Sequence, residues 1–134
     1  MMLPRSRSVP ATAATAALVL ALCGCSADGT AARRAADAFL SALADGDGAA
    51  ACALLTGSAR EAVEDREGDC PGGVLELGIA EDGAGDAEVY GRAAIVRSGG
   101  TAVFLTPGDD GWLVRAAGCA PVADAPFDCV LDGS

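Results

Sequence analysis

The sequence predicts one α+β domain, in which N-terminal helices pack on an antiparallel meander of four to five strands. Apolar residues recur at helical spacing from Ala32 to Leu43, which indicates an amphipathic helix. Beyond residue 86 the period changes to an alternation of apolar and polar residues, interrupted by glycine-containing turns. Helices that come first and hairpins that come last are typical of an α+β layer arrangement.

Residues 1–24 have the pattern of an export signal, which is removed and plays no part in the fold. Two basic residues, Arg5 and Arg7, precede an apolar run from Ala11 to Cys23. This run is shorter than the about 20 residues that a membrane-spanning helix needs. The charge, the length and the small residues at the end of the run all favour a signal peptide.

The end of this run, Leu22-Cys23-Gly24-Cys25, resembles the lipobox of bacterial lipoproteins. The resemblance implies that Cys25 carries a diacylglyceryl group and begins the mature chain, with residues 25–29 as an acylated tether. Two acyl chains hold a protein stably on a membrane, whereas one does not. We therefore expect a lipid-anchored protein on the extracytoplasmic face of the cell membrane. The alternative is a plain secretory peptide that leaves Cys25 as an ordinary thiol.

The mature chain is strongly acidic. Without residues 1–24 it holds seven basic and nineteen acidic residues, a formal charge of −12. Nucleic acid is not an expected partner, because affinity for it depends on Lys and Arg that neutralise phosphates. The expected partners are the membrane, through the lipid anchor, and an unknown protein or small apolar ligand. Residues 30–134 are sufficient for a single domain.

The chain contains no His, Lys, Asn or Gln. The absence of His excludes an ordinary Ser-His-Asp triad and removes the usual acid–base group near neutral pH. No Cys-x-x-Cys pair is present either, so the sequence predicts no metal site and no cofactor.

Four cysteines remain once Cys23 leaves with the signal and Cys25 is acylated. An even number of cysteines in an exported domain predicts disulfides, and four cysteines allow three pairings. We choose the two local bridges, each closing a short loop worth about 3 kcal/mol in the chain-entropy model. The bridges are Cys52–Cys70 and Cys119–Cys129.

The first two helices are predicted from their periodicity and caps. The first has Thr30 as a plausible N-cap and Gly46 as its stop. A second, short helix begins after Asp47 and runs through Cys52 to Leu55. Residues 45–48 could also suggest a calcium loop, but the later acidic ligands of such a loop are missing.

Two further helices are expected. Ser58 and Glu61 have the spacing of a capping box, which predicts a helix from Ala59 to Arg66 that Gly68 ends. Residues 71–79 are ambiguous: Pro71 suits a first helical turn, yet Leu75, Leu77 and Ile79 alternate as in a strand. We favour a short helix here, followed by an acidic loop over residues 80–86.

Five strands follow. The first two, residues 86–90 and 93–97, flank Gly91-Arg92, which fits a type II′ turn. A third strand, residues 101–106, precedes a wider turn at residues 107–111. The fourth strand, residues 112–118, should place Trp112, Val114 and Ala116 on one face and Arg115 on the other. Pro121 should end that strand, and residues 127–131 can return as a short fifth strand.

Several stretches resemble a group of small actinobacterial lipoproteins of unknown function. They are Asp69-Cys70, Thr101-Ala102-Val103-Phe104-Leu105, Gly111-Trp112, Ala116-Ala117-Gly118-Cys119 and Pro126-Phe127-Asp128-Cys129. The group looks like the nuclear transport factor 2 superfamily, cone-shaped α+β domains with a curled sheet that include ketosteroid isomerase. The resemblance implies a pocket between the sheet and the helices. The candidate pocket residues are Phe39, Tyr90, Phe104 and Trp112.

We expect a non-catalytic binding or interaction domain, for which no catalytic residue is predicted. Members of the superfamily range from enzymes to binding modules, so the fold alone assigns no function. The alternative is a small enzyme of isomerase or dehydratase type, with Asp37 or Tyr90 in the pocket. A nucleophile elbow is missing, because no Gly-x-Ser-x-Gly occurs.

Overall fold

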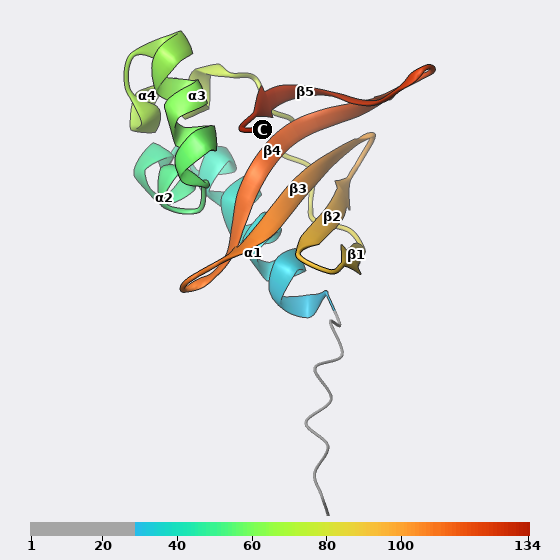
Figure 1. Cartoon of the computed structure of the whole chain (residues 1–134). Helices are drawn as coiled ribbons and strands as arrows, with labels where there is room; N and C mark the ends of the chain where they lie inside the picture. The colour runs from blue at the N-terminus through green and yellow to red at the C-terminus, as the bar shows by residue number, and fades with distance from the viewer. Residues whose placement is uncertain (1–28) are drawn as a thin grey trace, which may run out of the picture.

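The computed structural model describes residues 29–134, which form four helices followed by five strands (Figure 1). The helices are α1 (Thr30–Ala44), α2 (Gly48–Ala53), α3 (Gly57–Glu67) and α4 (Cys70–Glu76). The strands are β1 (Ala87–Tyr90), β2 (Ala93–Ser98), β3 (Thr101–Gly108), β4 (Gly111–Val122) and β5 (Ala125–Asp132). The predicted export signal, the predicted lipidation site at Cys25 and most of the predicted tether lie outside the described residues.

The strands form one antiparallel sheet in the order β1-β2-β3-β4-β5, so each strand pairs with its neighbour in sequence. Helix α1 runs across one face of this sheet, and the three shorter helices gather beside it (Figure 1). The predicted α+β order of helices and meander is therefore confirmed. The sheet is neither closed nor strongly curled, in contrast to the curled cone that the resemblance implies. Its two edge strands, β1 and β5, pair only with β2 and β4, and β1 has just four residues.

Helices α2, α3 and α4 each begin at a residue whose side chain accepts a hydrogen bond from an exposed backbone N–H group. Asp47 caps α2 as predicted, accepting a hydrogen bond from the Ala50 N–H at 3.0 Å. Helix α3 is instead capped by Thr56, whose Oγ1 accepts from the Ala59 N–H at 3.1 Å. The prediction of Ser58 as this cap is wrong, because Ser58 already lies within the helix. Thr30 is likewise the first residue of α1, and Gly29 occupies the cap position.

Helices α2 and α4 pack closely against each other. Residues 71–79, ambiguous in sequence, do begin as a helix, and Asp69 caps it by accepting from the Gly72 N–H at 2.9 Å. A disulfide joins Cys52 of α2 to Cys70 of α4. Gly48 permits the contact, because a Cβ built there would lie 1.6 Å from the Pro71 carbonyl oxygen.

Strands β2 to β5 are longer than the sequence indicates, whereas β1 is one residue shorter. Gly108 pairs with Gly111, so the turn between β3 and β4 is the tight Asp109-Asp110 pair rather than a wide loop. Strand β4 continues past Pro121, which was expected to end it. Proline lacks an N–H, and it is tolerated here because the β4–β5 register shifts between Ala120 and Val122.

An irregularity in β4 separates the two faces of the sheet. Leu105 is opposite Val114 and Phe104 is opposite Ala116, which leaves Arg115 as the extra residue of a bulge. Val114 therefore packs into the large core beneath the helices, whereas Ala116 joins a smaller cluster on the outer face. The prediction that Val114 and Ala116 share a face is wrong, because sequence alternation cannot reveal a bulge.

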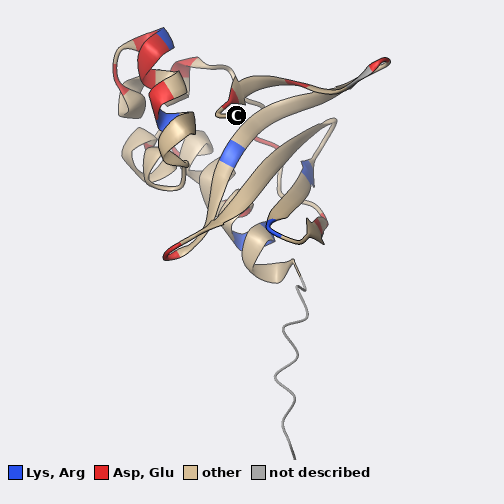
Figure 2. Cartoon of the chain, viewed as in Figure 1, with Lys and Arg blue, Asp and Glu red and all other residues tan. Residues whose placement is uncertain are grey.

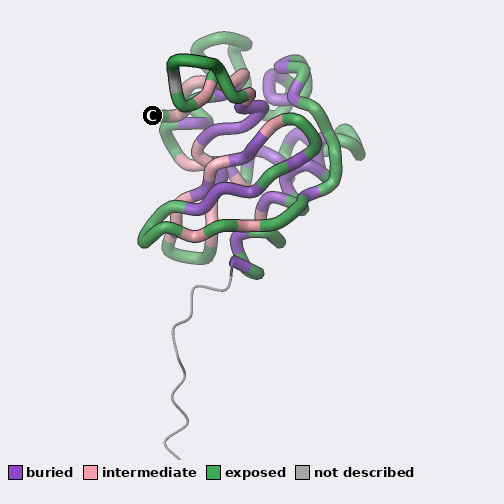
Figure 3. The backbone as a smooth tube through the Cα atoms, turned by 90° about the vertical axis from the view of Figure 1, so that its right-hand side faces the viewer, coloured by how far each residue is buried: buried purple, intermediate pink, exposed green. Residues whose placement is uncertain are grey.

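The two faces carry two apolar clusters. The larger lies between the sheet and the helices, where Phe39, Leu55, Leu105 and Val114 are almost completely buried. Figure 3 shows buried segments where helices and strands meet and exposed segments at the turns. Every described residue of the outer cluster lies on a strand. Its buried members are Ile95, Ala102, Ala116 and Cys119, with Phe104, Phe127 and Cys129 packed against them.

Candidate functional site

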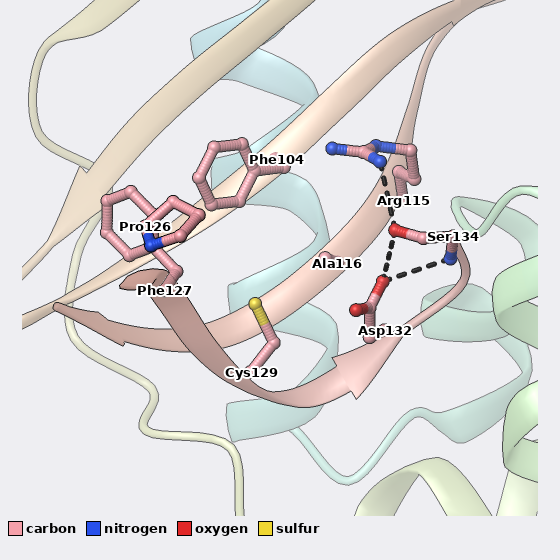
Figure 4. A pocket seen from close by; sticks show the side chains of 8 residues that line it. All are labelled: Phe104, Arg115, Ala116, Pro126, Phe127, Cys129, Asp132 and Ser134. Carbon is pink, nitrogen blue, oxygen red and sulfur yellow. Dashed lines mark hydrogen bonds between the residues drawn. The ribbon is translucent and has the colours of Figure 1, made fainter. Parts of the chain in front are cut away.

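A groove of about 260 Å³ opens on the outer face of the sheet, over β3, β4 and β5. Figure 4 shows its side chains in front of the strands, with a helix behind the sheet. The groove therefore lies on the side of the sheet that faces away from α1. Its lining residues are Phe104, Arg115, Ala116, Pro126, Phe127, Cys129, Asp132 and Ser134.

Two aromatic rings form the apolar part of this groove. The Phe104 and Phe127 centroids are 5.0 Å apart with an interplanar angle of 74°, an edge-to-face arrangement that aromatic pairs favour. Both phenylalanines are partly buried and partly exposed to solvent. Apolar side chains that stay accessible next to a hollow are typical of ligand-binding sites.

The opposite part of the groove is polar. The guanidinium carbon of Arg115 lies 5.9 Å from the centre of the Phe104 ring, within the range of a cation–π contact. Arg115 Nη1 donates a hydrogen bond to Ser134 Oγ at 3.0 Å. The Ser134 hydroxyl and backbone N–H both donate to Asp132 Oδ1 (Figure 4). The three polar residues thus form one short chain of hydrogen bonds.

The hydrogen bonds from Ser134 hold the pKa of Asp132 below its usual range, and the nearby Arg115 charge acts in the same direction. Hydrogen bonds donated to a carboxylate favour its charged form. Asp132 is therefore ionised near neutral pH. It offers the groove a negative charge and hydrogen-bond acceptors, and it is not a proton donor there.

A disulfide fixes the strand that forms one wall of the groove. Cys119 of β4 and Cys129 of β5 lie directly opposite each other and are bonded. Both predicted bridges are therefore present. Cys129 also lines the groove, so this bridge holds the wall that carries Phe127 against the centre of the sheet.

The four predicted pocket residues do not meet in one place. Phe104 lines the groove, but Phe39 is fully buried in the large core. Trp112 packs half-buried against that same core. Tyr90 is 65% exposed, and its hydroxyl donates to Glu88 Oε2 at 3.0 Å. This hydrogen bond and the Glu88 charge raise the pKa of Tyr90.

The acids considered for an enzyme also lie outside the groove. Asp37 is exposed on α1, and α1 packs on the other face of the sheet. Neither Asp37 nor Tyr90 is among the residues that line the groove. The geometry thus brings neither candidate catalytic group to this hollow.

Sequence reasoning missed Arg115, Asp132 and Ser134 as site residues. One signal was present: Arg115 is the only cation after residue 97, within the apolar stretch Trp112–Ala117. Alternation already places Arg115 on the face opposite Val114, but it gives no sign of the bulge that brings Ala116 to the same face. Asp132 and Ser134 reach the groove only because β5 returns alongside β4.

A second hollow, of about 270 Å³, lies where the described chain begins. It is lined by Gly29, Thr30, Arg33, Asp86 and Ala87. Its arginine serves the fold, because Arg33 donates to the carbonyl oxygens of Ala84 and Gly85. Arg33 thereby holds the acidic loop of residues 80–86 against α1.

Charge is distributed unevenly over the domain. Acidic residues gather on α3 and at the tips of the β3–β4 and β4–β5 hairpins (Figure 2). Within residues 29–134, none of the helices is long and apolar enough to cross a membrane. No known protein family, curated protein or solved structure matches this chain.

Proposed function

We propose that this protein is a non-catalytic binding domain, tethered through acylated Cys25 to the outer face of a bacterial cell membrane. In this proposal the groove over β3, β4 and β5 takes an apolar ligand or an apolar side chain of a partner protein. One observation carries it: the aromatic pair Phe104 and Phe127 borders a hollow on the face of the sheet that none of the helices within residues 29–134 covers.

The distribution of buried residues supports a role in binding. A sheet needs one packed face to be stable, and the helices already cover the other face with the large core. The outer aromatic cluster is therefore not required to give the sheet a packed face. Contiguous accessible apolar groups on a soluble domain mark binding sites more often than they serve stability.

The two disulfides support export, because such bonds persist in oxidising compartments. We further propose a distant relationship to the nuclear transport factor 2 superfamily. The order of helices before a meander supports this relationship, although the sheet of this protein is more open than a cone.

The anchor is tested by mass spectrometry of the protein recovered from a bacterial membrane. We expect a mature chain that begins at residue 25 and carries diacylglyceryl mass on Cys25. A Cys25→Ser variant should keep its leader and lose the lipid. A mature chain that begins elsewhere, or that lacks acyl mass, would contradict the anchor and leave the groove proposal unaffected.

Binding is tested by titrating the purified protein with Nile red, an uncharged apolar fluorophore. We expect saturable fluorescence that the Phe127→Ser variant reduces strongly, because this change removes half of the aromatic pair. Tyr90→Ser is the matched control, since Tyr90 is an exposed aromatic residue away from the groove. Equal fluorescence in all three proteins would show that the groove is not a binding site.

A further inference from the structure

We propose that the groove takes a small molecule that combines an apolar ring or chain with a single carboxylate, and that Arg115 binds this carboxylate. The inference rests on the proposed binding function and deepens it by naming the ligand class. It arises from the unusual position of Arg115, at a β-bulge on an apolar face.

Arg115 has unused hydrogen-bonding capacity. A guanidinium carries five N–H donors, and the structure records one hydrogen bond from this side chain, to Ser134. Within residues 29–134 the structure records one ion pair, between Arg97 and Glu88, and Arg115 takes no part in it. The guanidinium of Arg115, next to the Phe104 ring, therefore has no carboxylate of the described residues bonded to it.

The neighbouring groups define the shape of the ligand. Arg115 lies over the edge of the aromatic region, so an anion bonded to it would place its apolar body near Phe104 and Phe127. The planar fork of a guanidinium matches the two oxygens of a carboxylate. The volume of the groove, about 260 Å³, suits a small ring system of one or two fused rings, or a short chain.

The ionised Asp132 limits the charge of the ligand. Ser134 links the two side chains: its hydroxyl accepts a hydrogen bond from Arg115 and donates one to Asp132. A second negative charge on the ligand would face this carboxylate at short range. The site therefore favours a monoanionic carboxylate over a dianion such as a phosphate monoester.

The test compares two probes with the same ring system, 2-naphthoate and its neutral analogue 2-naphthamide. Binding to the purified full chain is followed through the Nε–H signal of Arg115 in ¹H–¹⁵N spectra and by probe fluorescence. We expect the carboxylate to bind at least about ten-fold more tightly and to shift the Arg115 signal, because hydrogen bonds to charged groups are the stronger ones. Naphthyl phosphate should bind more weakly than 2-naphthoate.

Two variants complete the test. Arg115→Gln should reduce 2-naphthoate affinity about ten-fold and leave 2-naphthamide nearly unchanged. Arg97→Gln, which removes the same charge from an exposed arginine of β2, should change neither affinity.

The outcomes separate the two proposals. Equal affinity of the wild-type protein for both probes would overturn the carboxylate inference while the binding function stands, and this comparison needs no variant. Tighter binding of naphthyl phosphate would overturn the preference for a monoanion. If neither probe binds, the groove proposal fails together with the inference.

Discussion

At the scale of single residues, the cap of α3 shows that one hydrogen bond decides at which residue a helix begins. Thr56 and Ser58 are both hydroxyl residues near the start of α3, and only Thr56 Oγ1 accepts a backbone N–H. The capping-box spacing of Ser58 and Glu61 favours Ser58 as the N-cap, whereas Thr56 occupies that position. The backbone of Thr56 is extended while that of Ser58 is helical, and side-chain spacing does not reveal this difference.

This assignment predicts different costs for two similar changes. Thr56→Ala should lower the free energy of unfolding by about 1 kcal/mol, because the Ala59 N–H loses its acceptor. Ser58→Ala should change it by less than about 0.5 kcal/mol, as surface substitutions usually do. Urea denaturation of both variants measures the difference. A larger cost at Ser58 than at Thr56 would contradict the assigned cap.

Asp132 carries a prediction about pH. Its folded-state pKa is lowered by Ser134, so the hydrogen bonds contribute stability that is fully present above the unfolded pKa of about 3.9. That contribution is lost as the pH falls through the folded pKa. Asp132→Asn should therefore lower stability at pH 7 and have little effect in strong acid.

Denaturation of wild type and Asp132→Asn across this pH range tests the prediction. Asp128→Asn, a change of another exposed acid on β5, is the control for the loss of one negative charge. If the Asp132→Asn difference grew as the pH fell below about 4, the assigned direction of the pKa shift would be wrong.

At the scale of elements, the contact between α2 and α4 depends on the absence of a side chain. A Cβ at Gly48 would lie 1.6 Å from the Pro71 carbonyl oxygen, so Gly48→Ala must push the two helices apart. We expect a loss of at least about 2 kcal/mol in the free energy of unfolding, as for overpacked cores.

Gly57→Ala is the matched control. Gly57 begins α3, and a Cβ there meets no atom within 4 Å. This change should be neutral or stabilise by up to about 1 kcal/mol, because it restricts the unfolded chain. Thermal and urea denaturation distinguish the two variants, and similar effects at both positions would contradict the close α2–α4 contact.

The two disulfides should act on different elements. Replacing Cys52 and Cys70 by Ala should lower stability by about 3 kcal/mol and leave Nile red binding to the folded protein unchanged. Replacing Cys119 and Cys129 by Ala should also weaken Nile red binding, because β5 carries Phe127 and forms a wall of the groove. Identical binding by both double variants would contradict this division.

At the scale of the whole molecule, the order of elements was predictable and the placement of the site was not. Helical periodicity, local cysteine spacing and glycine-containing turns depend on near neighbours in sequence, and they predicted the helices, both bridges and the meander. The groove depends on the bulge that brings Ala116 to the outer face and on the return of β5 beside β4. Both are properties of strand register, which sequence alternation alone does not determine.

Large aromatic side chains alone do not indicate a pocket, because the face of the sheet on which each one lies also depends on strand register. Phe39 and Trp112 are large apolar residues at helix and strand spacing, and they pack against the core between sheet and helices. Phe104 lies on the other face of the sheet, because Val103 and Leu105 face the helices and Phe104, between them on β3, faces outward. Sequence predicted the alternation but not which face holds the hollow.

The central claim is that ligands bind on the outer face of the sheet and not between sheet and helices. The most direct measurement is a map of backbone amide shifts in ¹H–¹⁵N spectra of the full chain during titration with 2-naphthoate. We expect the largest shifts at Phe104, Ala116 and Phe127, with little change along α1. Shifts concentrated at Phe39 and Trp112 would contradict it, because they would place the ligand in the core beneath the helices.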